Sequence, residues 1–157
     1  MKIFAFNHQA GHHYTILETF EAGLVLNGAE VKAIRAGQIN LKGSFITIRE
    51  SKTAPKARSE AFLSKAHISL YSKASLPAYV PDRERKLLLR KKEIQSLKGK
   101  LGQKGLTLTP LKVYNKGGLL KLEFGLSKGK KQWDKRQSLK EKDAKRKIQR
   151  TLKNFTY

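Results

Sequence analysis

Alternating apolar and polar positions divide the first half of the chain into short strands. Residues Tyr14–Leu26 combine β-branched and aromatic side chains in the manner of a strand. Ser44–Glu50 alternates like a half-buried strand, and the alternation returns between Phe62 and Leu70. In this last segment we expect one face to carry Phe62, Ala66, Ile68 and Leu70. The polar, proline-bearing segment Ser51–Ser59 is predicted to be a mobile loop.

The strongest hairpin signal lies further along the chain. Leu106–Tyr114 and Leu119–Leu126 are two apolar runs that flank the turn sequence Asn115-Lys116-Gly117-Gly118. The second run alternates strictly. Pro110 interrupts the first run, where the apolar phase shifts, so a bulge or an edge position is expected there.

Two segments have the spacing of helices. Asn27 and Glu30 form a capping-box pattern, which predicts a short helix over about Gly28 to Ala36. A second helix is indicated where Leu87-Leu88-Leu89 leads into apolar residues spaced by three and four positions. These are Ile94, Leu97 and Leu101, and Gly102 and Gly105 end the pattern.

The elements together predict a mainly β fold. Five or six short strands with two or three short helices favour a small closed β-barrel of the OB type, a class that binds oligonucleotides on its surface. The alternation stops after Leu126. We therefore expect an OB-like barrel over residues 1–126 and a basic tail over residues 127–157.

The composition of the chain narrows the class of binding partner. The chain has 157 residues, 34 Lys and Arg against 12 Asp and Glu, and a formal net charge of +22. A field of this sign attracts polyanions, so nucleic acid is the leading partner and an anionic membrane surface the weaker alternative. No stretch approaches the roughly 20 apolar residues of a membrane span, and the N-terminus does not resemble a signal peptide. A cytoplasmic protein is expected.

The tail is densely basic. Residues 127–157 contain twelve Lys and Arg against three Asp and Glu, and a narrow apolar stripe runs through Ala144, Ile148, Leu152 and Phe155. An isolated helix of this composition is marginal in water. We predict a tail that is disordered when free and helical when phosphates neutralise it. The alternative is that the tail only attracts RNA in general.

Trp133 stands alone in this cationic stretch. A role in stacking on a base is physically apt. The alternative is that its ring folds back and holds the tail against the barrel, and the residues alone do not separate these two interpretations.

Catalysis finds little support. The chain has no cysteine, which excludes Cys-ligated zinc and thiol catalysis, and its acids are scattered, whereas nucleases cluster carboxylates around metal. His8 and His12 are four residues apart but lack an evident third ligand, so we expect no metal site. No phosphate-binding glycine loop is present, and no cofactor is expected. A ribosomal structural protein remains an alternative, and it would co-purify with ribosomes at constant stoichiometry.

An ordered set of motifs resembles the SmpB family, the SsrA/tmRNA-binding proteins of bacteria. The matching segments are Tyr14–Gly23, Gly28–Lys32, Arg35–Gly37, Arg85–Leu89, Lys104–Leu108, Lys128–Lys131 and Asp134–Arg136. Each segment is weak alone, and the ordered set is specific.

The resemblance implies a role in trans-translation. Proteins of this family bind the tRNA-like domain of transfer-messenger RNA (tmRNA) and deliver it to ribosomes stalled on broken messages. The protein takes the place of the missing anticodon arm, and its tail becomes helical in the empty mRNA channel of the small subunit, beside the decoding centre. The implied partners are tmRNA, the ribosome and, with charged tmRNA, elongation factor Tu; the implied state is a monomer.

The resemblance also implies two sets of site residues. The tmRNA-facing set is Asn7, Glu30, Lys32, Arg35, Asn40, Lys86 and Leu89. The ribosome-facing set at the root of the tail is Gly129, Lys130, Lys131, Trp133, Asp134, Lys135 and Arg136. Glu30 is an acid on an RNA-binding surface; the resemblance favours a hydrogen bond to a base or ribose, and its alternative role is the helix cap.

Two segments depart from the family pattern. The family usually follows its early asparagine with basic residues, whereas Asn7 is followed here by His8, Gln9 and Ala10. The Ser51–Ser59 loop is longer than the usual turn and adds Lys52, Lys56 and Arg58. We interpret this loop as a solvated insertion; the alternative is that its charges compensate for those missing near Asn7.

Overall fold

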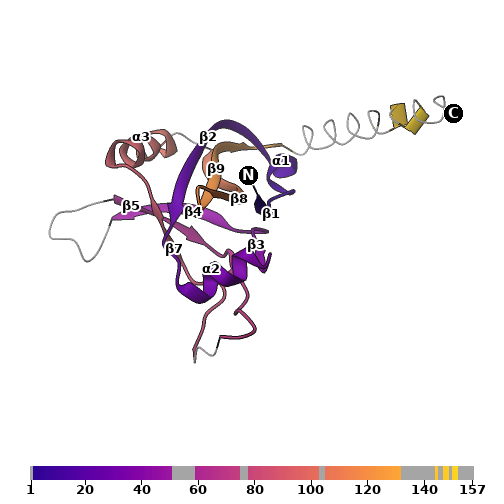
Figure 1. Cartoon of the computed structure of the whole chain (residues 1–157). Coiled ribbons are helices and arrows are strands. Elements are labelled where there is room, and N and C mark those ends of the chain that lie inside the picture. Colours follow the sequence, from indigo (N-terminus) through magenta and orange to yellow (C-terminus); the bar gives the residue numbers. More distant parts are fainter. Residues whose placement is uncertain are drawn as a thin grey trace.

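A computed structural model describes residues 2–50, 59–74, 78–102 and 105–131, together with 144, 147, 148, 150 and 151. Over these residues the chain is mainly β, as predicted (Figure 1). The strands are β1 (Ile3–Phe6), β2 (Tyr14–Leu24), β3 (Ile39–Asn40), β4 (Phe45–Glu50), β5 (Ser59–Ser64), β6 (His67–Ile68), β7 (Arg85–Leu88), β8 (Leu106–Lys116) and β9 (Leu119–Gly129). The helices are α1 (Ala10–His13), α2 (Gly28–Arg35) and α3 (Lys91–Leu101).

The strand pairings form a ring. Seven strands make one antiparallel sheet in the order β1-β8-β4-β5-β7-β2-β9, and β3 and β6 make a separate pair. β8 also pairs with β9, so following the ladders from β8 through β4, β5, β7, β2 and β9 leads back to β8. The ring is thinnest between β4 and β8, where the register contains one pair, Ile46 opposite Leu108.

The β8–β9 hairpin confirms the strongest sequence signal. The turn residues Gly117 and Gly118 have φ values of +58° and +80°, a region that glycine enters without steric cost. The register shifts between Pro110 and Lys112, so the proline marks a bulge. Along β9 the side chains of Leu120, Leu122, Phe124 and Leu126 are buried, as their alternation indicates.

The core lies between the strands and the two longer helices. α2 contributes the fully buried Ala33 and Ile34, and α3 contributes Ile94 and Leu97. α2 also has the predicted capping box, because the Asn27 side chain accepts from the Glu30 N–H while the Glu30 carboxylate accepts from the Asn27 N–H. α2 therefore forms where its local signals lie.

Two predictions about strand boundaries were wrong. Between Phe62 and Leu70 the chain forms two strands, and in β5 the buried apolar residues are Ala61 and Leu63 instead of Phe62. Lys65 separates the strands with a φ of +56°, which shifts the phase of alternation.

The leucine run before α3 is also a strand. Arg85–Leu88 forms β7, which pairs with β5 on one side and β2 on the other, and the helix begins only after Arg90. Three successive leucines satisfy a helical and a strand pattern equally well, and the central place between two strands decides the outcome.

Candidate nucleic-acid interface

Leu88 lines three neighbouring grooves of the described surface. In β7 the side chains of Arg85 and Leu87 are buried, whereas Leu88 is 58% exposed. Leu88 contacts Gly23 on β2, where an added Cβ would lie 3.3 Å from its Cδ1 atom. Three grooves meet at this leucine, and we call their combined lining the Leu88 surface.

The first groove lies between β2 and the start of α3. Its volume is about 740 Å³, and it is open and mixed in polarity. Its cationic lining is Arg90 and Lys121, and its acids are Glu21 and Glu93.

The second groove is smaller and more apolar. It has a volume of about 330 Å³ and is lined by Leu24, Leu26, Val31, Leu88, Leu119 and Leu120, with Arg35 and Lys121 beside them. The Arg35 guanidinium donates to the Gly118 carbonyl across 3.3 Å, which joins α2 to the β8–β9 turn.

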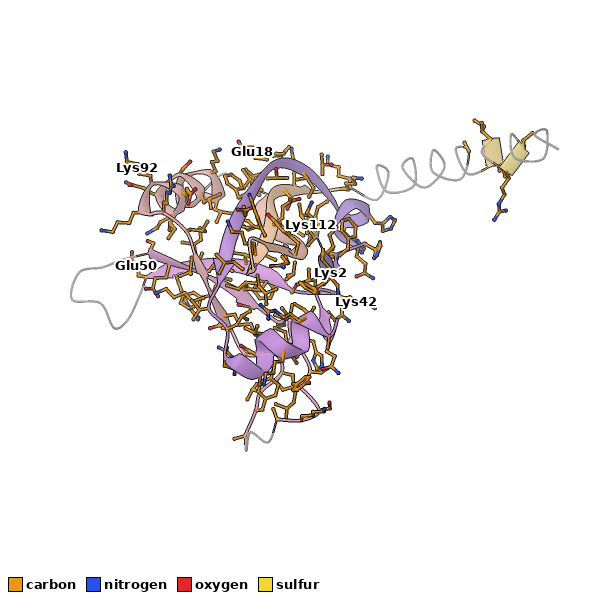
Figure 2. The ribbon with its side chains drawn as sticks, in the orientation of Figure 1. Lys2, Glu18, Lys42, Glu50, Lys92 and Lys112 are labelled. Atoms are coloured by element: carbon orange, nitrogen blue, oxygen red, sulfur yellow. The ribbon has the colours of Figure 1, made fainter. Side chains whose placement is uncertain are left out.

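The third groove lies between β7, α3 and the start of β5. Its volume is about 750 Å³, and it is lined by Lys86, Lys91 and Lys98 together with Glu60 and Ile94. α3 and the far end of β4 lie at the same end of the molecule, as Lys92 and Glu50 show, and Lys2 and Lys42 lie away from it (Figure 2). The Lys98 ammonium is 3.2 Å from the Glu50 carboxylate.

The Leu88 surface combines two features that suit RNA binding. Its lysines and arginines can bind phosphates, and an exposed leucine beside an apolar groove can contact the faces of bases or sugars. Three residues of the predicted tmRNA-facing set, Arg35, Lys86 and Leu89, line these grooves. Sequence reasoning missed Leu88 and Lys121. If the segment had been assigned as a strand, the alternation of side chains would have placed Leu88 on the outside, next to the buried Leu87.

Glu30, from the same predicted set, is buried beneath the surface. Its side chain is fully buried, and its carboxylate accepts hydrogen bonds from Arg83 Nε at 2.8 Å and from Arg85 Nε at 3.0 Å, besides the helix cap. Arg85 is also fully buried and donates to the carbonyls of Ala66, Pro81 and Arg83. This Glu30 cluster joins α2, β7 and the segment before β7, and it supports the capping role of Glu30 instead of contact with RNA.

The Glu30 cluster holds a charge. Burial alone raises the pKa of Glu30, but the hydrogen bonds from Arg83 and from the Asn27 N–H, with the charge of Arg85, outweigh it. The net pKa is lowered, so Glu30 is ionised at neutral pH and the cluster carries two guanidinium groups around one carboxylate.

Glu21 lies in the first groove and is held by cations as well. Lys121 Nζ lies 2.5 Å and Lys116 Nζ 3.1 Å from its oxygens, and the Tyr114 hydroxyl donates to it. The hydrogen bonds from Lys121, Tyr114 and Lys116 lower the pKa of Glu21 to about 2. Burial and the bond to Glu21 raise the pKa of Tyr114.

The other members of the tmRNA-facing set lie apart from the Leu88 surface. Asn7 is buried, and its amide donates to the Pro110 carbonyl at 2.9 Å, so it anchors the chain at the β8 bulge. Asn40 accepts from the Lys42 N–H at 2.8 Å. The Lys32 ammonium lies 5.8 Å from the centre of the Tyr71 ring.

The root of the tail is attached to α1. Gly129 pairs with Tyr14 at the end of the β2–β9 ladder. Beyond it, the Lys130 N–H donates to the His13 carbonyl and its ammonium donates to the Gly11 carbonyl, each at 2.9 Å. Lys131 is exposed.

Several predicted features lie outside the described residues. These are Trp133, Asp134, Lys135 and Arg136 in the tail and residues 51–58 of the predicted loop. Of the tail's apolar stripe, Ala144 and Ile148 are described; both are helical, and Thr151 Oγ1 donates to the Lys147 carbonyl at 3.0 Å.

The histidines in α1 and just before it make ring contacts. His8 meets the exposed Phe6 edge-on with ring centres 4.9 Å apart, and His12 meets His13 at 5.0 Å. Among the residues that the structure describes, no three metal-ligating side chains gather at one point. In the same part of the chain, every helix is too short or too polar to cross a membrane.

Comparisons with known proteins agree on one family. The family model for the SmpB protein matches residues 4–154. SsrA-binding proteins of Shouchella clausii and Enterococcus faecalis are each 51% identical to the chain, over 97% and 98% of it and over 92% and 94% of their own lengths.

A solved structure gives the same relationship in three dimensions. It is described as "tmRNA-SmpB: a journey to the center of the bacterial ribosome", and its matching chain is 42% identical with a TM-score of 0.63, covering 86% of this chain and 93% of its own. With a family match that spans almost every residue, the chain belongs to the SmpB protein family.

Proposed function

We propose that this protein binds the tRNA-like domain of tmRNA and delivers it to stalled ribosomes for trans-translation. Its relatives are SsrA-binding proteins, and the similar solved chain comes from tmRNA-SmpB on the ribosome. The single observation that carries the proposal for this chain is the Leu88 surface, where cationic grooves converge on an exposed apolar residue. The protein acts by contact and needs no catalytic step or cofactor.

The Leu88 surface gives the proposal a physical basis. Arg35, Lys86, Arg90, Lys91, Lys98 and Lys121 line its grooves. Each phosphate that a lysine or arginine neutralises contributes to affinity through release of counterions, and Leu88 adds a contact that does not depend on salt. In this proposal Glu30 acts through the fold by holding α2 to β7, and Asn7, Lys32 and Asn40 lie apart from the Leu88 surface.

The architecture that fits this role is a closed OB-like barrel over residues 1–126 followed by a basic tail over 127–157. The ring of strand pairings supports the closed barrel. The tail, with Gly129, Lys130, Lys131, Trp133, Asp134, Lys135 and Arg136 at its root, would act in the small-subunit decoding centre and sense an empty mRNA channel. Cytoplasmic ribosomes and elongation factor Tu with charged tmRNA complete the set of partners, and the protein acts as a monomer.

Binding to RNA tests the first part of the proposal. The affinity of the full chain is measured for the tRNA-like domain of tmRNA and for an ordinary tRNA, with wild type, Leu88→Ser and Ile3→Ser. Leu88→Ser should weaken tmRNA binding about tenfold, because about 1.4 kcal/mol of apolar contact is lost. Ile3 is a matched control, since it is 50% exposed on β1 and lines none of the three grooves. Equal affinity for the two RNAs, or equal loss in both variants, would contradict the proposal and favour a general RNA-binding module.

Tagging on stalled ribosomes tests the second part. Replacing Lys130, Lys131, Lys135 and Arg136 by alanine should leave tmRNA affinity largely intact while abolishing tagging. The barrel ladders continue to Gly129 without these side chains, so the RNA surface stays formed. Loss of tmRNA binding in this variant would place the tail on the tRNA-like domain instead.

A further inference from the structure

Acids are scarce in this protein, yet three of them line the grooves of the Leu88 surface. They are Glu21, Glu60 and Glu93, from a total of 12 Asp and Glu against 34 Lys and Arg. A surface that attracted phosphate by charge alone would gain from having neutral residues at these places. The acids therefore need a physical explanation.

Two of the three have clear structural contacts. The Glu93 carboxylate accepts from the Arg90 N–H at 2.7 Å and so caps the start of α3. Glu21 accepts from the Tyr114 hydroxyl and from two lysines, which joins β2 to the hairpin. Glu60 is different, because within the described residues its side chain has a single partner, the Lys86 ammonium, and it neither caps a helix nor accepts from a hydroxyl.

The Glu60–Lys86 pair is placed to affect binding more than folding. The Lys86 ammonium lies 2.5 Å from Glu60 Oε1, and both residues line the third groove. The Lys86 side chain is 43% exposed and that of Glu60 is 21% exposed. A phosphate can therefore reach the lysine, but it meets a cation whose charge is already matched.

We infer that Glu60 attenuates charge-driven RNA binding by holding Lys86. The pair withholds one positive charge of the Leu88 surface from any phosphate that passes, which lowers the affinity for RNA that binds through charge alone. The inference rests on the proposed function, because it requires RNA to bind at the Leu88 surface.

The salt dependence of affinity gives the test, because one lysine released to phosphate adds about 0.9 to the slope of log K against log salt. Binding of a generic RNA hairpin to the full chain is titrated between 50 and 200 mM salt for wild type and Glu60→Gln. We expect a steeper slope in the variant, and hence an additional gain of about 3.5-fold on going from 200 to 50 mM salt. The two binding curves should converge at about 1 M salt, where the ionic contribution vanishes.

Two further variants control for net charge and for folding. Asp82→Asn removes the same charge from a residue that pairs with His67 and lines none of the three grooves. This variant should change the slope by much less than Glu60→Gln does. In a Lys86→Gln background, Glu60→Gln should no longer steepen the slope. Thermal unfolding establishes that each variant is folded, and Glu60→Ala replaces Glu60→Gln if the latter is not.

The outcomes are distinct. The inference would be overturned by parallel slopes for wild type and Glu60→Gln, or by weaker binding in Glu60→Gln. It would also be overturned if the slope still steepened in the Lys86→Gln background, or if Asp82→Asn steepened it equally. If Leu88→Ser still weakens tmRNA binding in such a case, the proposed function stands and only the role of Glu60 fails. If Leu88→Ser has no effect, the proposed RNA surface itself is wrong.

Discussion

Glu30 and Glu60 make the same kind of ion pair in opposite surroundings. Glu30 is fully buried beside the fully buried Arg85, whereas Glu60 and Lys86 lie at the surface of a groove. Removing a charge from water costs several kcal/mol and is offset only when every donor and acceptor has a partner, so a buried cluster must be complete. A surface pair exchanges partners with water and salt at little cost. Burial therefore makes the first pair part of the fold and leaves the second available for regulation of binding.

The largest effect should come from breaking the buried cluster. Arg85→Met leaves the Glu30 carboxylate and the carbonyls of Ala66 and Pro81 without the guanidinium that now satisfies them. We expect a loss of about 3–5 kcal/mol in the free energy of unfolding, measured by urea denaturation. Arg49→Met is the matched control, because the Arg49–Glu84 pair is exposed, and its loss should be near 1 kcal/mol. Comparable losses in the two variants would remove the distinction between buried and surface pairs.

The second-largest effect should come from acid, which weakens the buried cluster. The folded-state pKa of Glu30 lies below its ordinary value of 4.5, so the cluster contributes stability above pH 4.5 and loses it as the pH falls through the folded-state pKa. Stability measured as a function of pH should fall below pH 4.5 in wild type. The Glu30→Gln variant should be less stable than wild type at neutral pH, and its stability should fall less steeply as the pH is lowered. An identical acid slope in the two proteins would show that Glu30 does not contribute.

A smaller effect is expected from the helix cap alone. Asn27→Ala removes the side-chain acceptor of the Glu30 N–H but leaves the ion pairs of Glu30 in place. The expected loss is about 1 kcal/mol in the free energy of unfolding. A loss as large as that of Arg85→Met would mean that the cap, and not the buried charge, organises the cluster.

The smallest effect on folding should come from the surface pair. Glu60→Gln should change the free energy of unfolding by less than about 0.5 kcal/mol, because the partly exposed lysine regains water when its partner is lost. A shift in denaturation midpoint as large as that of Asn27→Ala would place Glu60 among the structural acids.

Local signals explain which elements were predictable from the sequence. The β8–β9 hairpin and α2 depend on neighbouring residues, namely two glycines at the turn and the pairing of Asn27 with Glu30. The strand β7 was missed because its assignment depends on β5 and β2, which lie far away in the sequence. The phase error in β5 arose from a backbone conformation at Lys65 that its residue type does not announce.

The candidate site was predictable only in part for the same reason. Arg35, Lys86 and Leu89 were assigned through family resemblance, and the structure brings them to the grooves. Leu88 required knowledge of the strand, and Lys121 required the pairing of β9 with β2. The function of Arg85 could not be inferred, since its acceptors come from four separate positions of the chain.

The way in which β9 is paired has a mechanical consequence. β9 has β2 on one side and β8 on the other along most of its length, and the chain continues from its last residue, Gly129, towards the C-terminus. A pull along the axis of β9 must therefore shear two antiparallel ladders at once, whereas a terminal strand held at one end could be peeled away one bond at a time. Tension on the tail would be shared over many hydrogen bonds, so the Leu88 surface would keep its shape while the tail is under load.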